Sequence, residues 1–256
     1  MPEGDTVYQA AARIRRRFEG QVLRYSQFRV PRYALVDLTG RRVDAVRSIG
    51  KHLLIDVGDH AIHSHLKMEG AWMVHPLGTR WRRPGHQARI VLRTDGWEAV
   101  GFELGVCEWI PDPDTELSYL GPDLLDPAFD AAAAVTNLTR DPDRPIGTAL
   151  LDQHLMAGVG NVYRCEACFL RGVRPARPVG EVDVPAMVDL CQRLLVANKD
   201  RTVRTTTGNT RRGQQSWVYG RGGRPCLRCR TPIERTFLGD DNSEDRVLYY
   251  CPRCQS

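Results

Sequence analysis

Four cysteines near the C-terminus constrain the fold of this chain more tightly than any other sequence feature. Cys226 and Cys229 form one Cys-x2-Cys pair, and Cys251 and Cys254 form a second. Each pair can place two thiolates on one tight turn, and two such turns close a tetrahedral site that suits zinc. A β-hairpin between the turns accommodates the spacing. Four thiolates leave no open position, so the sequence predicts one structural zinc ion (Zn2+) in a zinc-finger module at residues 216–256.

Along the remainder of the chain, the sequence pattern changes from one typical of strands to one typical of helices. Many short β-branched or alternating runs, punctuated by turns, are typical of a sandwich or barrel. Apolar residues later recur at helical spacing, and a Thr-, Gly- and Arg-rich connector follows them. We therefore predict an α+β multidomain protein with an N-terminal β-sandwich domain (1–123) and a helical domain with connector (124–215). The predicted strands are 42–48, 52–57, 61–66, 88–93 and 98–103, and the predicted helices are 127–139, 146–156, 161–171 and 184–199.

The first residues combine a helix start with an unusual amine. We expect Asp5 or Thr6 to cap a helix whose apolar positions follow the 3.6-residue period and which Gly20 ends. If Met1 is removed, Pro2 becomes an α-amino terminus with a pKa of about 8. A secondary amine attacks an aldehyde to give a permanently cationic iminium, and the Glu3 carboxyl beside it can shuttle protons. The alternative is that Pro2 merely follows an efficiently removed Met.

Charge is distributed unevenly along the chain. Residues 201–256 hold eleven arginines and five acidic residues, so their surplus exceeds the net charge of +5 of the whole chain. A basic end of this kind suits a polyanionic partner, although a solvated surface explains it equally simply. We find no run of 18 apolar residues and no apolar leader, and we expect a soluble cytoplasmic protein.

Three further patterns bear on chemistry. The Gly158-x-Gly160-Asn161 turn joins two predicted helices and can hold a phosphate, with Arg164 one turn further on. Lys51 comes at the start of a strand, where it can contact a phosphate or the N-terminal amine. Core or surface roles are favoured over metal binding for His63 and His65, and over redox chemistry for Cys165 and Cys168.

Taken together, these residues resemble the family of formamidopyrimidine-DNA glycosylase and endonuclease VIII. The resemblance covers Pro2-Glu3-Gly4, Gly50-Lys51, the turn at 158–161 and the finger ending in Cys254-Gln255. It implies that the helical domain is a helix-two-turns-helix element. It further implies that Pro2 is a Schiff-base nucleophile and Glu3 a proton shuttle. The residues implied to grip the phosphates flanking the lesion are Lys51, Asn161 and Arg246, with Arg164 close by.

The same resemblance assigns residues 63–72 to a loop that fills the space left by a flipped base. Lys67 and Met68 would contact DNA there, with Met68 as the apolar wedge. Residues 102–108 lack an Arg-Arg-Phe-Gly run, and with residues 120–125 they look closer to the endonuclease VIII branch, which favours oxidised pyrimidines. Three positions depart from the family pattern. The family usually has Glu at the position of Thr6, Gln or Gly at that of Lys67, and an aromatic or small residue at that of Glu69.

The predicted function is that of a bifunctional DNA glycosylase and abasic-site (AP) lyase of base-excision repair. It would act by β,δ-elimination as a monomer on damaged DNA, in the cytoplasm at the nucleoid and away from membranes. An alternative from another class is a non-catalytic zinc-ribbon protein that binds nucleic acid. An alternative within the class is a glycosylase for oxidised purines.

Overall fold

The computed structural model describes residues 2–238 and 247–256, and the chain divides into two compact units. Unit 1 comprises residues 1–119 and unit 2 comprises residues 120–256. Among the described residues, no helix has the length and apolar character needed to cross a membrane.

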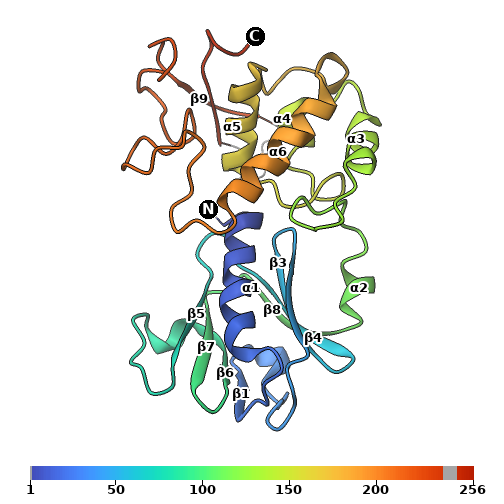
Figure 1. Cartoon of the computed structure of the whole chain (residues 1–256), viewed down its shortest axis with the longest axis vertical. Coiled ribbons are helices and arrows are strands. Elements are labelled where there is room, and N and C mark those ends of the chain that lie inside the picture. The colour runs from blue at the N-terminus through green and yellow to red at the C-terminus, as the bar shows by residue number, and fades with distance from the viewer. Residues whose placement is uncertain (1, 239–246) are drawn as a thin grey trace. The chain divides into compact units, whose positions relative to one another are not determined.

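Unit 1 contains one long helix and two antiparallel four-stranded sheets (Figure 1). Strand order is β1-β6-β7-β5 in one sheet and β2-β3-β4-β8 in the other. The elements are α1 (Gly4–Phe18), β1 (Tyr25–Phe28), β2 (Ala45–Ile49), β3 (His52–Val57), β4 (His60–His65), β5 (Ala71–Pro76), β6 (Ala88–Arg93), β7 (Trp97–Phe102), β8 (Val106–Pro111) and the short α2 (Pro113–Glu116).

The core of unit 1 lies under α1. The apolar stripe of this helix is buried together with side chains of β3, β4, β6 and β7, which explains why its period is 3.6 residues. The helix begins one residue before the predicted cap, because Glu3 rather than Asp5 or Thr6 is the N-cap residue. The buried residues of the stripe are Val7, Ala10, Ala11, Ile14 and Phe18.

Unit 2 contains four α-helices and a two-stranded hairpin in its described part. Asp130 and Asp183 cap two of the helices by accepting from backbone N–H groups of Ala133 and Ala186 (2.9 and 3.1 Å). The elements are α3 (Ala131–Thr139), α4 (Ile146–Ala149), α5 (Asn161–Arg171), α6 (Val184–Asn198), β9 (Glu234–Phe237) and β10 (Val247–Tyr250).

Helix α5 faces two cores. One side packs with α3, α4 and α6 through residues such as Tyr163 and Cys168. The other side packs with the hairpin module through Cys165 and Phe169, and Leu248 of β10 belongs to the same cluster. The helical element and the cysteine module of unit 2 therefore share one helix.

The predicted fold class is confirmed: an N-terminal helix with two sheets, a helical region and a C-terminal hairpin with the cysteine cluster. Predicted ranges 52–57, 88–93 and 161–171 coincide with β3, β6 and α5. The range 146–156 is wrong beyond Ala149, because the Asp152 side chain accepts from the His154 N–H (3.0 Å) and forms a turn. Strands β1, β5 and β8 were not predicted.

Candidate active site and metal centre

At the start of the chain, Pro2 directly precedes a buried carboxyl group. Pro2 is partly exposed and directly precedes Glu3. Glu3 is fully buried, and it is the N-cap residue of α1 with an extended backbone conformation. The Glu3 carbonyl accepts from the N–H groups of Thr6 and Val7 (2.9 and 3.1 Å), so the first turn fixes its position. The positive end of the helix dipole lies here and favours the unprotonated form of a nearby amine. If Met1 is removed, this arrangement can supply a nucleophile and a proton carrier to one reacting atom.

Lys51 occupies the tight turn between β2 and β3. Ile49 pairs with His52, so Gly50 and Lys51 form a two-residue connection in which Gly50 adopts φ +56°. Glycine meets this left-handed requirement at low cost, and it leaves the partly exposed Lys51 at the turn. Lys51 and Pro2 both belong to unit 1.

A hydrogen-bonded chain of side chains follows Lys51 across the second sheet. His52 Nδ1 lies 2.8 Å from His63 Nε2, and His63 Nδ1 lies 3.3 Å from the Glu108 carboxylate. The Tyr119 hydroxyl lies 3.4 Å from His52 Nε2 at the other end. Burial, with neighbouring positive groups, lowers the pKa of His52 to about 3 and that of His65 to about 4. These two imidazoles are therefore neutral at neutral pH. His52 was missed in the sequence, although its register opposite His65 follows once the strands are paired.

The loop at 66–70 presents an apolar tip. Its five residues close on a hydrogen bond from the Gly70 N–H to the Leu66 carbonyl (2.9 Å). A Cβ at position 70 would lie 2.4 Å from that carbonyl oxygen, so only glycine fits there. Met68 is 55% exposed at the tip, which is unusual for so large an apolar side chain.

Lys67 adopts a backbone conformation that glycine would adopt more easily. Its φ is +51°, and its N–H donates to His65 Nδ1 (3.0 Å). The side chain passes over Gly105, where an added Cβ would lie 2.2 Å from Lys67 Cγ. The loop thus holds Lys67 and Met68 side by side and exposed.

In unit 2, the predicted phosphate-binding turn leads into the first turn of α5. Gly158 adopts φ +111°, and Gly160 is the N-cap residue of the helix. Asn161 is only 6% exposed, and its Nδ2 donates to the Val247 carbonyl of β10 (2.7 Å). The side-chain amide thereby joins the turn to the hairpin.

Arg164 is fully buried beneath this turn. Its guanidinium donates to Asn161 Oδ1 and to the Val247 carbonyl (3.2 Å). Within the described residues its Nε and Nη1 have no hydrogen-bond partner. A buried guanidinium costs free energy unless it is compensated, so its retention here points to a role at the turn. Its hydrogen bonds connect the Asn161 side chain with the Val247 carbonyl.

Glu166 is a fully buried carboxyl that was not singled out in the sequence. It accepts from the backbone N–H groups of Trp217, Val218 and Tyr219 (2.7, 2.9 and 2.8 Å) and from the Thr206 hydroxyl. Burial raises the pKa of Glu166, and these four hydrogen bonds oppose the rise. The carboxyl fixes the segment that enters the cysteine module. The sequence signal that could have identified Glu166 is its position as an acidic residue between Cys165 and Ala167 in a predicted helix.

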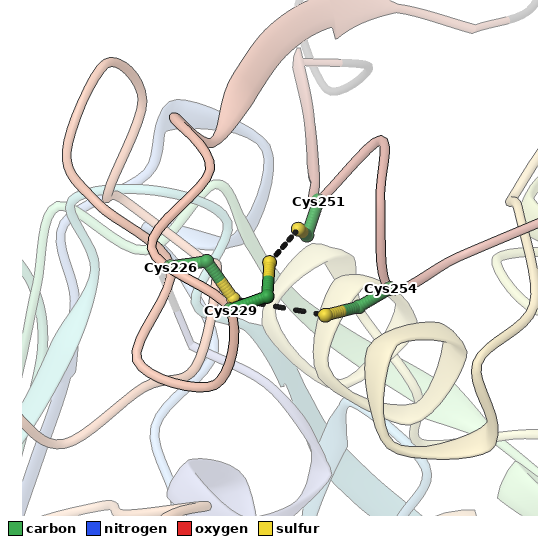
Figure 2. Close-up of side chains that lie close together, drawn as sticks. All are labelled: Cys226, Cys229, Cys251 and Cys254. Carbon is green, nitrogen blue, oxygen red and sulfur yellow. Dashed lines mark hydrogen bonds between the residues drawn. The ribbon is translucent and has the colours of Figure 1, made fainter.

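The four predicted metal ligands converge (Figure 2). Their sulfur atoms all lie within 4.8 Å of one another, with Cys229 3.4 Å from Cys251 and Cys226 4.0 Å from Cys254. Tetrahedral zinc with Zn–S bonds of about 2.3 Å requires sulfur separations of about 3.8 Å, so the cluster fits one such ion.

Backbone geometry supports both cysteine turns. Arg230, next to Cys229, adopts φ +69°, and its N–H donates to the Cys226 carbonyl (3.0 Å). Gln255 accepts from the Cys251 N–H (2.8 Å) and donates to the Val173 carbonyl (2.9 Å). Arg246, the predicted phosphate ligand of the hairpin, lies outside the described residues.

Comparison with known proteins places these features in one family. A model described as the formamidopyrimidine-DNA glycosylase N-terminal domain matches residues 1–103, and a model of the H2TH domain of the same enzyme matches residues 120–207. The chain belongs to the formamidopyrimidine-DNA glycosylase and endonuclease VIII family. By this membership it is a DNA glycosylase and AP lyase, and the predicted relationship is confirmed.

Curated relatives of this family cover the whole chain. It is 50% identical to "DNA-(apurinic or apyrimidinic site) lyase Nei2" of Mycolicibacterium smegmatis, over 100% of the chain and 99% of the relative. It is also 50% identical to "Probable endonuclease 8 2" of Streptomyces coelicolor, over 100% of the chain and 94% of the relative. The helix-two-turns-helix region is thus a family element.

Solved structures with the same fold are more distant in sequence. One is a complex of Lactococcus lactis Fpg (MutM) with DNA containing N7-benzyl-Fapy-dG, at a TM-score of 0.80, 23% identity and 99% coverage of both chains. Another is MutM with DNA containing carbocyclic 8-oxo-G, at a TM-score of 0.81, 22% identity and 100% coverage of both chains. At these identities the likeness concerns the fold.

Proposed function

We propose that Pro2 is the nucleophile of a glycosylase and lyase that removes oxidised pyrimidines from DNA. The proposal rests on one observation above others, the partly exposed Pro2 directly before the buried carboxyl group of Glu3 at the start of α1. It also rests on family membership, which supplies the reaction class. The damaged base must leave the stack before Pro2 can attack its sugar.

The proposed reaction has four steps. The Pro2 nitrogen attacks C1′ and the base departs, while Glu3 delivers a proton to the departing group or to the ring oxygen. The deoxyribose ring opens and leaves a cationic iminium between Pro2 and C1′. The iminium acidifies C2′, whose proton is removed as the bond to the 3′ phosphate breaks. A second elimination then releases the 5′ phosphate.

Other predicted residues act on the DNA backbone and the vacated space. We propose that Lys51, Asn161 and Arg246 bind phosphates near the lesion, with a dependence on salt that follows from release of counterions. Arg164 is fully buried, so it would act through Asn161 rather than touch DNA. Met68 would fill the space of the flipped base, and Lys67 would contact the strand beside it.

The cysteine cluster would hold one zinc ion through Cys226, Cys229, Cys251 and Cys254. With four thiolate ligands the ion supplies no open coordination position, so its contribution is structural. The cluster would fix the hairpin that carries Val247, the residue hydrogen-bonded to both Asn161 and Arg164.

Borohydride trapping with an abasic-site oligonucleotide tests the proposed nucleophile. The chain has three lysines, Lys51, Lys67 and Lys199, so the possible amine attachment sites are few. We expect peptide mapping to find the reduced adduct on Pro2 in protein whose Met1 is absent by intact mass. The matched control retains one residue before Pro2, which turns the nitrogen into an amide, and should give no adduct.

An adduct on a lysine, or none with the Met1-free protein, would contradict the proposal. Absence of any adduct with intact DNA binding would instead support a non-catalytic zinc-ribbon protein. The base preference is tested separately, by comparing excision of 5-hydroxyuracil and 8-oxoguanine from otherwise identical duplexes. Faster excision of 8-oxoguanine would assign the enzyme to oxidised purines.

A further inference from the structure

Strand β5 forms an open edge of its sheet in unit 1. It pairs with β7 on one side and ends the strand order β1-β6-β7-β5 (Figure 1). In the described part of the chain, the backbone of residues 71–75 forms hydrogen bonds with β7 only. Its outward N–H and C=O groups therefore have no backbone hydrogen-bond partner among the described residues.

A groove runs along this edge. Its volume is about 530 Å³, and residues 71–75 of β5 all contribute to its lining. Five consecutive residues of one strand can line a cavity only if the cavity follows the strand. The partly exposed Met73 and Val74 give the groove an apolar component, whereas Trp72 is buried.

Three arginines complete the lining. Arg13 comes from α1, and Arg80 and Arg82 come from the segment after β5. All three are exposed, and none forms an ion pair with a carboxylate among residues 2–238 and 247–256. Arg83 of the same segment, by contrast, is paired with Glu103 (3.2 Å).

The charge pattern of the groove calls for an anionic ligand. Three guanidinium groups around one cavity repel one another, and an anion between them would relieve that repulsion. Exposed edge strands often carry charged residues simply to prevent aggregation. That explanation accounts for charges on the strand, but it does not account for a groove lined by arginines from α1 and from the following segment.

The backbone of β5 distinguishes between two kinds of polyanion. A DNA backbone offers acceptors only, and the outward carbonyls of an edge strand would repel it. An extended peptide offers both donors and acceptors at the repeat of a strand. Apolar side chains of such a peptide can contact Met73, which lies on the face of the sheet opposite α1, while acidic ones contact the arginines.

We propose that the groove beside β5 binds an extended acidic peptide of a partner protein, which adds a strand to the sheet. The peptide would alternate acidic and apolar residues, because alternate side chains of a strand point to opposite faces. Apart from Ala71 and Trp72, which end the range 63–72, the lining residues lie outside those assigned to the reaction, so the proposal extends the function from catalysis to recruitment by another protein.

Fluorescence anisotropy with a labelled peptide of alternating Asp and Val residues tests this site. We expect binding to the full-length protein that weakens at least about tenfold, roughly 1.4 kcal/mol, when Arg80→Glu and Arg82→Glu are combined. The matched control combines Arg41→Glu and Arg42→Glu, which removes the same charge from exposed positions of unit 1 outside the groove. Glycosylase and lyase rates on a short duplex should be unchanged in both double variants.

Two further peptides keep the test independent of how the variants fold. A version N-methylated on alternate residues loses the strand-edge hydrogen bonds, and a version with Lys for Asp loses the charge match. Both should bind the unaltered protein at least about tenfold more weakly. The proposal would be overturned if either modified peptide bound as tightly as the original one, or if the Arg80/Arg82 variant bound the original peptide as tightly as the control variant does. Loss of DNA affinity instead of peptide affinity in the Arg80/Arg82 variant would also overturn it.

Discussion

Arg164 is a charged side chain with no exposed surface in the first turns of α5. Its guanidinium holds Asn161 Oδ1 and the Val247 carbonyl, so one residue connects the turn before the helix with β10. Glu166 lies two residues further on and holds the backbone at 217–219. Two buried charged side chains on one helix thus hold strand β10 and the segment at 217–219.

Replacing Arg164 should separate positioning from direct DNA contact. In Arg164→Met the side-chain volume is roughly kept, but Asn161 loses a charged donor. We expect the Kd for an abasic-site duplex to rise about tenfold, while the trapping rate at saturating DNA stays within a factor of about two. The control is Arg193→Met, an exposed arginine on α6 whose loss should leave both quantities unchanged.

An Arg164→Met protein with unaltered affinity would show that Asn161 needs no support. A collapse of the trapping rate at saturation would place Arg164 closer to the reaction than its burial indicates.

At the scale of elements, the loop at 66–70 combines a rigid base with an exposed tip. Leu66 and Trp72 are buried on either side of it, and the Trp72 indole donates to the Ser64 hydroxyl (3.0 Å). Gly70 closes the turn because no Cβ can be accommodated there. Mutations at the tip and at the base should therefore differ in kind.

Met68→Ala should impair base removal without destabilising the fold. Met68 is 55% exposed, so we expect the free energy of unfolding to change by less than about 0.5 kcal/mol. Excision of an oxidised base from duplex DNA should slow at least about tenfold, because a filled space favours the extruded base. Cleavage at a preformed abasic site in single-stranded DNA, where no base is displaced, should change little.

Leu35→Ala is the matched control, since Leu35 is fully exposed elsewhere in unit 1. If Met68→Ala slows both substrates equally, the tip acts on the sugar or the backbone rather than on the vacated space.

The second sheet of unit 1 should lose stability in mild acid. Burial lowers the pKa of His52 to about 3 and of His65 to about 4, whereas an unfolded chain titrates near 6.5. Below about pH 6.5 these two histidines bind protons in the unfolded chain but stay unprotonated in the folded sheet. Stability is thus full above that pH and falls toward pH 4, by up to about 1.4 kcal/mol per pH unit for each histidine.

His65→Asn should flatten this dependence, because an amide oxygen can still accept from the Lys67 N–H and does not titrate. The measurement is the urea midpoint, followed by tryptophan fluorescence, at about pH 7 and about pH 5. His86→Asn, at an exposed histidine, should keep the slope of the unaltered protein. Identical slopes in all three proteins would show that the buried histidines do not govern acid stability.

At the scale of the whole molecule, metal removal should affect DNA binding without altering the N-terminal chemistry. Cys254→Ser removes one of four converging ligands, so we expect loss of bound zinc and of DNA affinity together. The Pro2 amine should titrate as before, because it belongs to unit 1. Cys107→Ser, outside the cluster, should keep the metal, and retained DNA affinity in metal-free Cys254→Ser would contradict a supporting role for the finger.

Sequence reasoning located what spacing and special residues encode. The four cysteines converge as their spacing predicts. Glu3, however, replaces Asp5 or Thr6 as the N-cap residue, and the helix predicted before the turn at 158–161 already ends at Ala149. Contacts between residues distant in sequence could not be predicted from these local patterns. Arginine is normally exposed, so the burial of Arg164 could not be inferred from its type.

The missed strands have a similar explanation. β5 directly follows the loop at 66–70, and its first two residues fall within the range 63–72 that was assigned to the loop. His52 joins His63 only because β3 and β4 pair in one register. Such contacts follow from strand pairing rather than from local pattern.

Helix α5 takes part in two cores at once, and this has a consequence for how unit 2 opens. Its amide groups can reach solvent only when both packed sides are released, whereas those of α3 need only one core to open. In deuterium exchange followed by mass spectrometry, peptides from 161–171 should therefore be among the slowest in the unit to take up label. Stripping the metal should quicken that uptake, because one of the two coverings would then be lost.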